Sequence, residues 1–141
     1  RSKISVPNFF SEGKPEARLW KSFKKALSAA PQRWEATRLE TGSSAAGVPD
    51  LFLQDPRGHW HFVELKVARA VAVTLRPHQI SWLIRHAKGR VWVLVRSPTA
   101  IYLYPGSDII ELDNQGLKLN PAFSSGDPIN WGDLLSYLMK A

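Results

Sequence analysis

The stretch 47–68, GVPDLFLQDPRGHWHFVELKVA, constrains the fold more than any other part of the chain. At its centre, residues 55–58 (Asp-Pro-Arg-Gly) have the composition of a tight turn. Proline presets φ for such a turn, and glycine adopts the left-handed conformation that closes it. A loop formed by residues 56–58 predicts two antiparallel strands on either side, with Asp55 opposite His59.

Counting back along this hairpin places Asp50 directly opposite Glu64, and Phe52 opposite Phe62 on the same side. Two carboxylates opposed at roughly 5 Å between Cβ atoms repel each other and destabilise a sheet. A hard divalent cation held by oxygen ligands offsets that repulsion. The pair therefore predicts a metal site, on condition that the register is right, because a one-residue slip sends the two carboxylates to opposite faces.

The charge of the chain is unevenly distributed along its 141 residues, which carry a net charge of +7. Residues 1–100 contain 17 Lys or Arg and 7 Asp or Glu, which gives +10, whereas residues 101–141 contain 2 and 5, which gives −3. A basic body of this kind is typical of a protein that binds a polyanion, most often nucleic acid. A solvated basic surface without a partner explains the charge equally well.

The composition narrows the class of protein. The hydrophobic content of 44% over 141 residues predicts one folded domain, 1–141, with a core of its own. The absence of cysteine excludes disulfides, zinc–thiolate sites and thiol catalysis. No apolar run approaches the length of a membrane span and no signal-peptide pattern is present. We therefore expect no membrane contact and an intracellular location, in the cytoplasm, or in the host cytoplasm if the protein is viral.

The periodicity of the apolar residues predicts an α-β-β-β-α-β order. A strand, a crossover helix and a strand that is apolar on both faces predict a right-handed parallel connection. The segment 108–127 is rich in turn-forming residues and receives no element. The predicted elements are a helix over 15–30, a strand over 34–40, the hairpin strands within 47–68, a helix over 77–88, strands over 90–96 and 101–104, and a closing helix over 130–140.

Glu16 stands in the first turn of the first predicted helix. At 100° per residue, its position falls in the middle of the apolar stripe of that helix. A glutamate in the first turn complements the helix dipole. Alternatively, Glu16 points inward toward a metal, and the opposed carboxylates of the hairpin favour this second interpretation.

Four elements, in order along the chain, resemble the PD-(D/E)xK nuclease superfamily, which has the restriction-endonuclease-like fold. They are Glu16, Gly-x-Pro-Asp at 47–50, Glu-Leu-Lys at 64–66 and Leu-Arg-Pro-x-Gln-x-x-Trp at 75–82. The set is most similar to the virus-type replication-repair nuclease group of small phage nucleases. The resemblance covers about residues 14–104, leaves the C-terminal extension 105–141 unexplained, and implies an α/β fold. Its αβββαβ core has a mixed central sheet flanked by helices.

The resemblance also implies a metal site. It assigns Asp50 and Glu64 as metal ligands together with the backbone carbonyl of Leu65, and Glu16 as a ligand of a second metal or of its water. The implied metal is Mg²⁺, and Mn²⁺ is expected to substitute for it. Oxygen ligands of this kind suit both ions.

Two further catalytic roles come with the same resemblance. Lys66 activates the attacking water or stabilises charge on the phosphorane, and Gln79 positions Lys66 or the nucleophile. A solvated helix glutamine is the alternative for Gln79. The catalytic set is then Asp50, Glu64, Lys66 and Gln79.

Basic and hydroxyl side chains near these motifs are candidates for DNA contact, each beside a simpler explanation. Ser43 and Ser44 fit a phosphate site or an ordinary serine-rich turn, and Arg38 fits a substrate contact or a structural pair with Glu40. Strand alternation points His61 away from Glu64, which predicts a surface or packing role. Trp20, Trp82 and Trp92 are expected in the core rather than as stacking platforms. The candidates for nucleic-acid binding are Arg38, Ser43, Ser44, Arg69, Arg76 and His78.

The implied function is a metal-dependent DNA endonuclease that hydrolyses phosphodiester bonds. The resemblance suggests selectivity for branched or junction DNA in replication, repair or recombination, and a homodimer. A sequence-specific restriction or homing endonuclease, and a nickase or exonuclease, share the same active site. A non-catalytic nucleic-acid-binding module with this fold is an alternative of a different class, although it has no use for opposed carboxylates. A subunit whose specificity comes from a partner also fits the small size.

Overall fold

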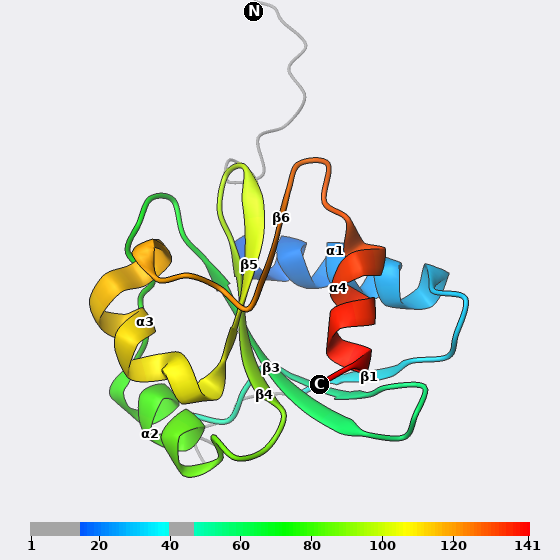
Figure 1. The fold of residues 1–141 in the computed structure, drawn as a ribbon, viewed down its shortest axis with the longest axis horizontal. Helices are drawn as coiled ribbons and strands as arrows, with labels where there is room; N and C mark the ends of the chain where they lie inside the picture. Colours follow the sequence, from blue (N-terminus) through cyan, green and yellow to red (C-terminus); the bar gives the residue numbers. More distant parts are fainter. Residues whose placement is uncertain (1–14, 40–46) are drawn as a thin grey trace, which may run out of the picture.

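The computed structural model describes residues 15–39 and 47–141 (Figure 1). Within these residues, six strands form one sheet in the order β1-β2-β3-β4-β5-β6, so that neighbours in the chain are neighbours in the sheet. The strands are β1 Glu35–Arg38, β2 Leu51–Gln54, β3 Trp60–Val67, β4 Val91–Arg96, β5 Ala100–Pro105 and β6 Phe123–Gly126. The helices are α1 Pro15–Ala29, α2 Pro77–Arg85, α3 Ile109–Gln115 and α4 Trp131–Met139, with 3-10 helices at Gly106–Asp108 and Gly116–Lys118.

The sheet is mixed. Strands β3 and β4 run parallel and are connected through α2, whereas the other described neighbours pair antiparallel. The segment from α1 to β4 therefore has the predicted αβββαβ order. The expected α/β fold, with a mixed sheet between helices, is confirmed.

Helices cover both faces of the sheet. Figure 1 shows α1 and α4 on one side and α2 and α3 on the other. Leu19 and Phe23 of α1 pack with Leu94 of β4 on the first side, and Leu83 of α2 packs with Val93 on the second. Strand β4 is buried along most of its length because both of its faces meet helices. The predicted doubly covered strand is confirmed.

The hairpin has the register obtained by counting residues. The backbone N–H of Gly58 donates to the carbonyl of Asp55 at 2.8 Å, and that of Asp55 donates to the carbonyl of His59 at 2.9 Å. Phe52 pairs with Phe62, so that continuing the register by two residues places Asp50 across from Glu64. The condition on which the metal-site prediction depended is met.

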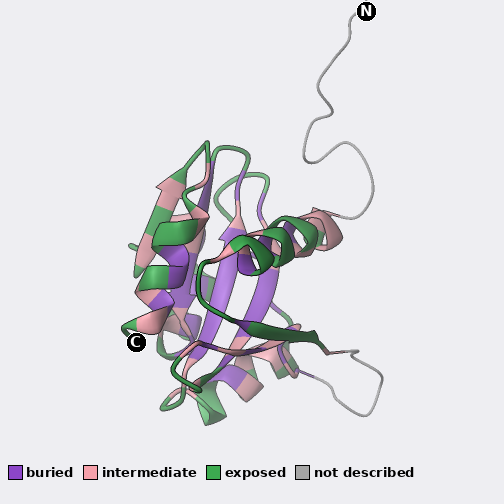
Figure 2. Cartoon of the chain, turned by 90° about the vertical axis from the view of Figure 1, so that its right-hand side faces the viewer, coloured by how far each residue is buried: buried purple, intermediate pink, exposed green. Residues whose placement is uncertain are grey.

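Burial falls off sharply toward the β1 edge. All four residues of β1 are exposed, while the strands at the centre of the sheet are buried (Figure 2). Trp34, just before β1, is buried against the core of the α1 side. No helix of the described residues is long and apolar enough to cross a membrane.

The segment 108–127, to which no element was assigned, contains regular structure. Helix α3 packs Leu112 into the core of the α2 side, and β6 pairs with β5, where Leu103 lies opposite Phe123. The sequence of β6, Phe-Ser-Ser-Gly, has no apolar alternation, and the strand is held by backbone pairing with β5. Helix α2 also ends at Arg85, three residues before the predicted Lys88.

Candidate active site

The loop that delivers Asp50 packs directly on helix α2. Gly47 has φ +85°, and a Cβ atom added there would overlap the backbone carbonyl of His78 in the first turn of α2. Only glycine combines this conformation with so close an approach. At the other end of the loop, Oδ2 of Asp50 accepts a hydrogen bond from the backbone N–H of Leu65 at 2.8 Å. Asp50 is thereby fixed beside the middle of β3.

Helix α2 adds Gln79 to the same place, and its amide contacts two charged side chains. Nε2 of Gln79 donates to Oε2 of Glu64 at 3.0 Å, and Oε1 of Gln79 accepts from Nζ of Lys66 at 3.0 Å. Nζ of Lys66 lies 3.8 Å from the same Glu64 oxygen. Oε1 also accepts from the backbone N–H of Arg76, the N-cap residue of α2. The structure thus brings Asp50, Glu64, Lys66 and Gln79 together, and the solvated alternative for Gln79 is wrong.

The adjacent carboxyl groups of Asp50 and Glu64 provide an environment that favours a cation. Glu64 is only 3% exposed, and burial together with the adjacent Asp50 charge raises the pKa of Glu64 to about 8, against the opposing effect of Lys66. Both causes act by disfavouring the charged form of the carboxyl group. The two carboxylates, together with the backbone carbonyl of Leu65 next to Glu64 in the chain, make up the predicted set of hard oxygen donors. This donor set fits a divalent cation such as Mg²⁺, and the roles of these residues as its ligands remain a prediction.

Glu16 does not join this group. It is exposed, and the predicted inward position is wrong because the buried stripe of α1 begins one turn later, at Leu19. Glu16 instead lines an open hollow of about 410 Å³ with residues that follow Lys66, including Ala68 and Arg69. Within the described residues, no group of three or more carboxylate or histidine side chains is close enough to hold a metal ion. A role for Glu16 at a second metal stays a prediction.

Most of the candidates for DNA contact lie on the surface around this site. Arg76 and His78 are exposed beside Gln79 at the start of α2, and Arg69 is exposed just after β3. Arg38 is exposed on the edge strand β1, where it pairs with Leu51, the residue after Asp50. Ser43 and Ser44 lie outside the described residues. DNA contact by any of these side chains remains a prediction.

Comparison with known proteins finds a distant likeness among solved structures. No protein-family model matches the chain, and no curated protein matches it. The chain is similar to a solved Holliday junction resolvase. That structure is Hjc from the archaeal hyperthermophile Archaeoglobus fulgidus, with a TM-score of 0.49 and 18% identity over 81% of this chain and 87% of that chain. At this distance, the chemistry of the site rests on the geometry of the chain's own residues.

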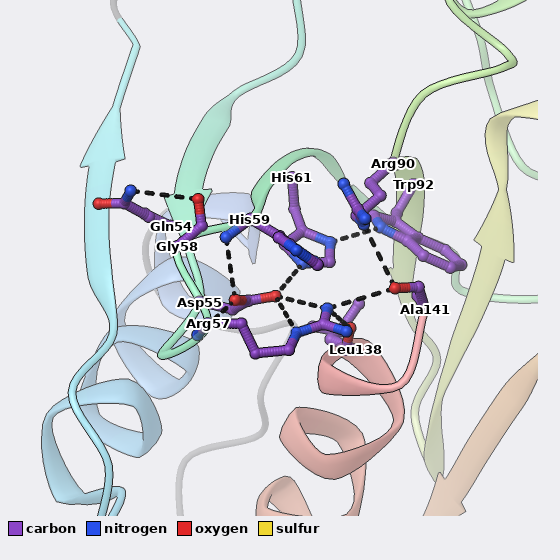
Figure 3. A network of polar contacts seen from close by, with 10 residues as sticks. All are labelled: Gln54, Asp55, Arg57, Gly58, His59, His61, Arg90, Trp92, Leu138 and Ala141. Carbon is purple, nitrogen blue, oxygen red and sulfur yellow. Dashed lines mark hydrogen bonds and ion pairs between the residues drawn. The ribbon is translucent and has the colours of Figure 1, made fainter.

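On the opposite face of the sheet, a buried polar network surrounds His61 (Figure 3). His61 is 0% exposed, its Nε2 lies 2.9 Å from Oδ2 of Asp55, and its Nδ1 accepts from the indole Nε1–H of Trp92 at 3.1 Å. Because an indole only donates, Nδ1 must be the unprotonated nitrogen, and Nε2 carries the proton that it donates to Asp55. Burial lowers the pKa of His61 despite the nearby Asp55, which agrees with a neutral ring. Of the two roles predicted for His61, the packing role is confirmed and the surface role is wrong, and its partners were not foreseen.

Asp55 connects this network to the hairpin turn. Burial alone would raise the pKa of Asp55, but hydrogen bonds from Arg57, His61 and the backbone outweigh it and hold that pKa well below its ordinary value. The guanidinium of Arg57 also donates to the carbonyl oxygens of Leu138, in the last turn of helix α4, and of Ala141, which follows the helix. The hairpin turn is therefore tied to the C-terminal segment. The sequence signal for this network was the strand alternation that pointed His61 away from Glu64, and it left a surface role open.

Proposed function

We propose that this chain is a metal-dependent DNA endonuclease that hydrolyses phosphodiester bonds. The observation that carries the proposal is the contact of Gln79 with both Glu64 and Lys66, beside the carboxylate of Asp50. Opposed carboxylates, a lysine and an amide that holds them have no evident use in a module that only binds nucleic acid. They suit hydrolysis of a phosphodiester, in which negative charge builds on the phosphate.

Each residue of the proposed active site has a different role in hydrolysis. Asp50, Glu64 and the carbonyl of Leu65 would hold Mg²⁺, or Mn²⁺ in its place. When bound, the cation neutralises phosphate charge and lowers the pKa of a coordinated water. Lys66 presents a compact positive charge to the phosphate and stabilises the charge that develops there. Gln79 keeps Nζ of Lys66 at hydrogen-bonding distance and orients Glu64, so that neither side chain must reorganise when substrate binds.

The motif resemblance supports a finer proposal for the substrate. The virus-type replication-repair group, with its Glu-Leu-Lys and Leu-Arg-Pro-x-Gln-x-x-Trp elements, favours branched or junction DNA in replication, repair or recombination. It also favours a homodimer. The charge of +10 over residues 1–100, from 17 basic and 7 acidic residues, supports DNA as the polyanionic partner.

Cleavage of a panel of DNA substrates tests the proposal. Single strands, a duplex, a flap and a four-way junction are incubated with Mg²⁺, Mn²⁺ or EDTA. We expect cutting with either metal, none with EDTA, and a loss of about 10²- to 10⁴-fold in Asp50→Ala and Lys66→Ala. The exposed residues Asp113 and Lys118 provide matched control variants, Asp113→Ala and Lys118→Ala, which should cut normally.

Two results would contradict the proposed endonuclease function or its substrate selectivity. Metal-dependent cutting at the wild-type rate in Asp50→Ala or Lys66→Ala would refute the assignment of the active site. Equal cutting of the junction and the plain duplex would refute only the selectivity for branched DNA.

A further inference from the structure

Five aromatic rings, which we call the aromatic row, form a continuous series on the sheet face that carries Glu64. The indole of Trp60 stacks on Phe52 with centroids 4.6 Å apart and planes 6° apart, and Phe52 contacts Phe62 at 5.1 Å. Phe62 contacts Trp82 of α2 at 5.4 Å, and Trp82 stacks on His86 at 3.9 Å. The His86 ring is held in place, because its Nδ1 lies 2.8 Å from the carbonyl oxygen of Trp82.

Part of the aromatic row lines an open hollow, which we call the aromatic pocket. Its walls are formed by Trp60, Phe62, Trp82 and His86, with Lys88 at its edge, around a volume of about 350 Å³. Trp60 is 51% exposed there. A single exposed apolar residue is ordinary. An exposed indole that is backed by a second ring and lines a hollow with further aromatic rings is a preformed stacking surface.

The aromatic pocket lies on the same two elements as the candidate active site. Phe62 precedes Glu64 by two residues on one face of β3, and Trp82 follows Gln79 by three residues on α2. At 3.3 Å per strand residue, Phe62 and Trp60 lie about 7 and 13 Å from Glu64 along β3, roughly two to four stacked nucleotides. A DNA strand with a phosphate at Glu64 therefore has bases within reach of the pocket.

We propose that the aromatic pocket binds an unpaired nucleobase of the DNA substrate, stacked against Trp60 or Trp82, with an adjacent phosphate at Lys88. The inference rests on the proposed nuclease function and narrows its substrate to DNA that carries unpaired nucleotides near the cleaved bond. Every base has a π face that stacks on aromatic side chains, whereas a paired base keeps its faces covered by its neighbours. The pocket is too far from the carboxylates to be part of the metal site.

Charge favours nucleic acid over a second copy of the chain as the occupant. Lys88 is exposed at the edge of the pocket, and Arg85 is exposed one turn before it on α2. Two such surfaces facing each other would repel, whereas a phosphate backbone complements both. The excess of basic residues over residues 1–100 also favours nucleic acid as the occupant.

Binding measured in EDTA, where no cleavage occurs, tests the proposal. The probes are a single-stranded oligonucleotide that carries one 2-aminopurine, and a fully paired duplex of the same sequence. The wild-type protein should quench 2-aminopurine fluorescence in the single strand. Trp60→Ala should weaken single-strand binding about 5- to 150-fold and change duplex binding by less than about twofold. Trp60→Phe should recover most of the affinity, because it keeps a ring over Phe52.

Two further variants provide a control for loss of apolar surface and a test of the phosphate contact. Ile110→Ala removes an apolar side chain of similar exposure on α3 and should bind both probes normally. Lys88→Ala should reduce the salt dependence of single-strand binding, because one phosphate contact is lost. If Trp60→Ala fails to fold in a thermal melt, Lys88→Ala and the quenching by the wild type decide the question.

Several outcomes would overturn the proposal. They are single-strand binding that is unchanged in Trp60→Ala, an equal loss for both probes, and the absence of quenching by the wild type. A wild-type dimer that dissociates in Trp60→Ala with single-strand binding intact would assign the pocket to a second copy instead. The two proposals fail separately. Metal-dependent cleavage with Trp60-independent binding refutes only the pocket, and Trp60-dependent binding without any cleavage refutes only the nuclease.

Discussion

Nε2 of Gln79 donates a hydrogen bond to Oε2 of Glu64 across 3.0 Å and thereby joins helix α2 to the middle of strand β3. The other end of the same amide accepts from Lys66 at 3.0 Å. The neutral amide of Gln79 thus contacts both the carboxyl group of Glu64 and the amino group of Lys66, which lie on the same face of β3. Gln79 acts through these two side chains, which makes it a positioning residue of the proposed active site.

Replacing Gln79 should slow the reaction without unfolding the protein. In Gln79→Ala, Glu64 loses a donor and Lys66 loses an acceptor, and we expect kcat to fall about 10- to 100-fold, as for partners that orient metal ligands. Gln79→Glu should not restore the rate, because it places a third carboxylate against Glu64. Single-turnover kinetics and a thermal melt measure the two effects separately. Gln115→Ala, an exposed glutamine of α3, is the control, and a normal rate in Gln79→Ala would exclude the positioning role.

Metal binding should be visible in stability as well as in activity. Mg²⁺ at a hundredfold excess over its Kd stabilises the folded state by about 2.7 kcal/mol, which for a domain of this size is a rise in Tm of about 5–10 °C. Asp50→Asn removes a charged ligand but keeps an acceptor for the N–H of Leu65, so the variant should fold and lose most of the shift. Differential scanning calorimetry with and without Mg²⁺ measures this. A full rise in Tm with Mg²⁺ in Asp50→Asn, or no rise in the wild type, would contradict the metal site. Asp113→Asn is the matched control and should show the full rise.

Two glycines with positive φ allow a paired test of the loop that carries Asp50. Gly47→Ala combines a strained backbone with overlap of the His78 carbonyl, whereas at Gly58 (φ +87°) the nearest atom to an added Cβ is 3.8 Å away. We expect Gly58→Ala to cost about 1 kcal/mol of unfolding free energy and Gly47→Ala clearly more. Chemical denaturation measures both. Gly47→Ala should also reduce cleavage where it still folds, and equal costs for the two variants would mean that the loop is not packed on α2.

Acid should destabilise the protein through His61. Burial lowers the pKa of His61, so the unfolded chain takes up a proton below about pH 6.5 that the folded chain does not. The unfolded state then binds more protons, and stability falls with decreasing pH by at most about 1.4 kcal/mol per pH unit. Asp55 has a depressed pKa, so its contribution is present above about pH 3.9 and is lost only at lower pH.

The variant His61→Gln isolates this effect, because glutamine can still donate to Asp55 and accept from Trp92. The unfolding free energy of the wild type, minus that of His61→Gln, should decrease as the pH falls from 7 to 5. Above about pH 7 this difference should stay level. The exposed Gln115 supplies a control that does not titrate, and Gln115→Ala should leave the pH dependence as it is. A constant difference in His61→Gln would show that His61 titrates as in the unfolded chain.

Much of the fold was accessible from local patterns. The turn residues and the alternation of the strands predicted the register of β2 and β3, and with it the placement of Asp50 opposite Glu64. Local patterns failed where an element depends on distant partners. Strand β6 has almost no apolar residues and exists because β5 offers it backbone hydrogen bonds. Glu16 is in line with the buried stripe of α1 at helical spacing, but a helical angle does not say where along the sheet a helix turn lies. The first turn of α1 lies outside the core.

By itself, the sequence determined the order of the elements from α1 to β5, the hairpin register and the set Asp50, Glu64 and Lys66. It could do so because turn conformation and side-chain alternation arise from the backbone within a few residues. Only the tertiary structure decided that Gln79 holds Glu64 and Lys66 from a helix, that Trp92 completes the His61 network, and that Trp60 belongs to a row of rings. The hydrogen bonds among these contacts join residues 13 to 31 positions apart, and nothing in the local pattern of either partner specifies the other. A buried hydrogen bond or a ring contact forms only when packing has brought both groups together and removed the water between them.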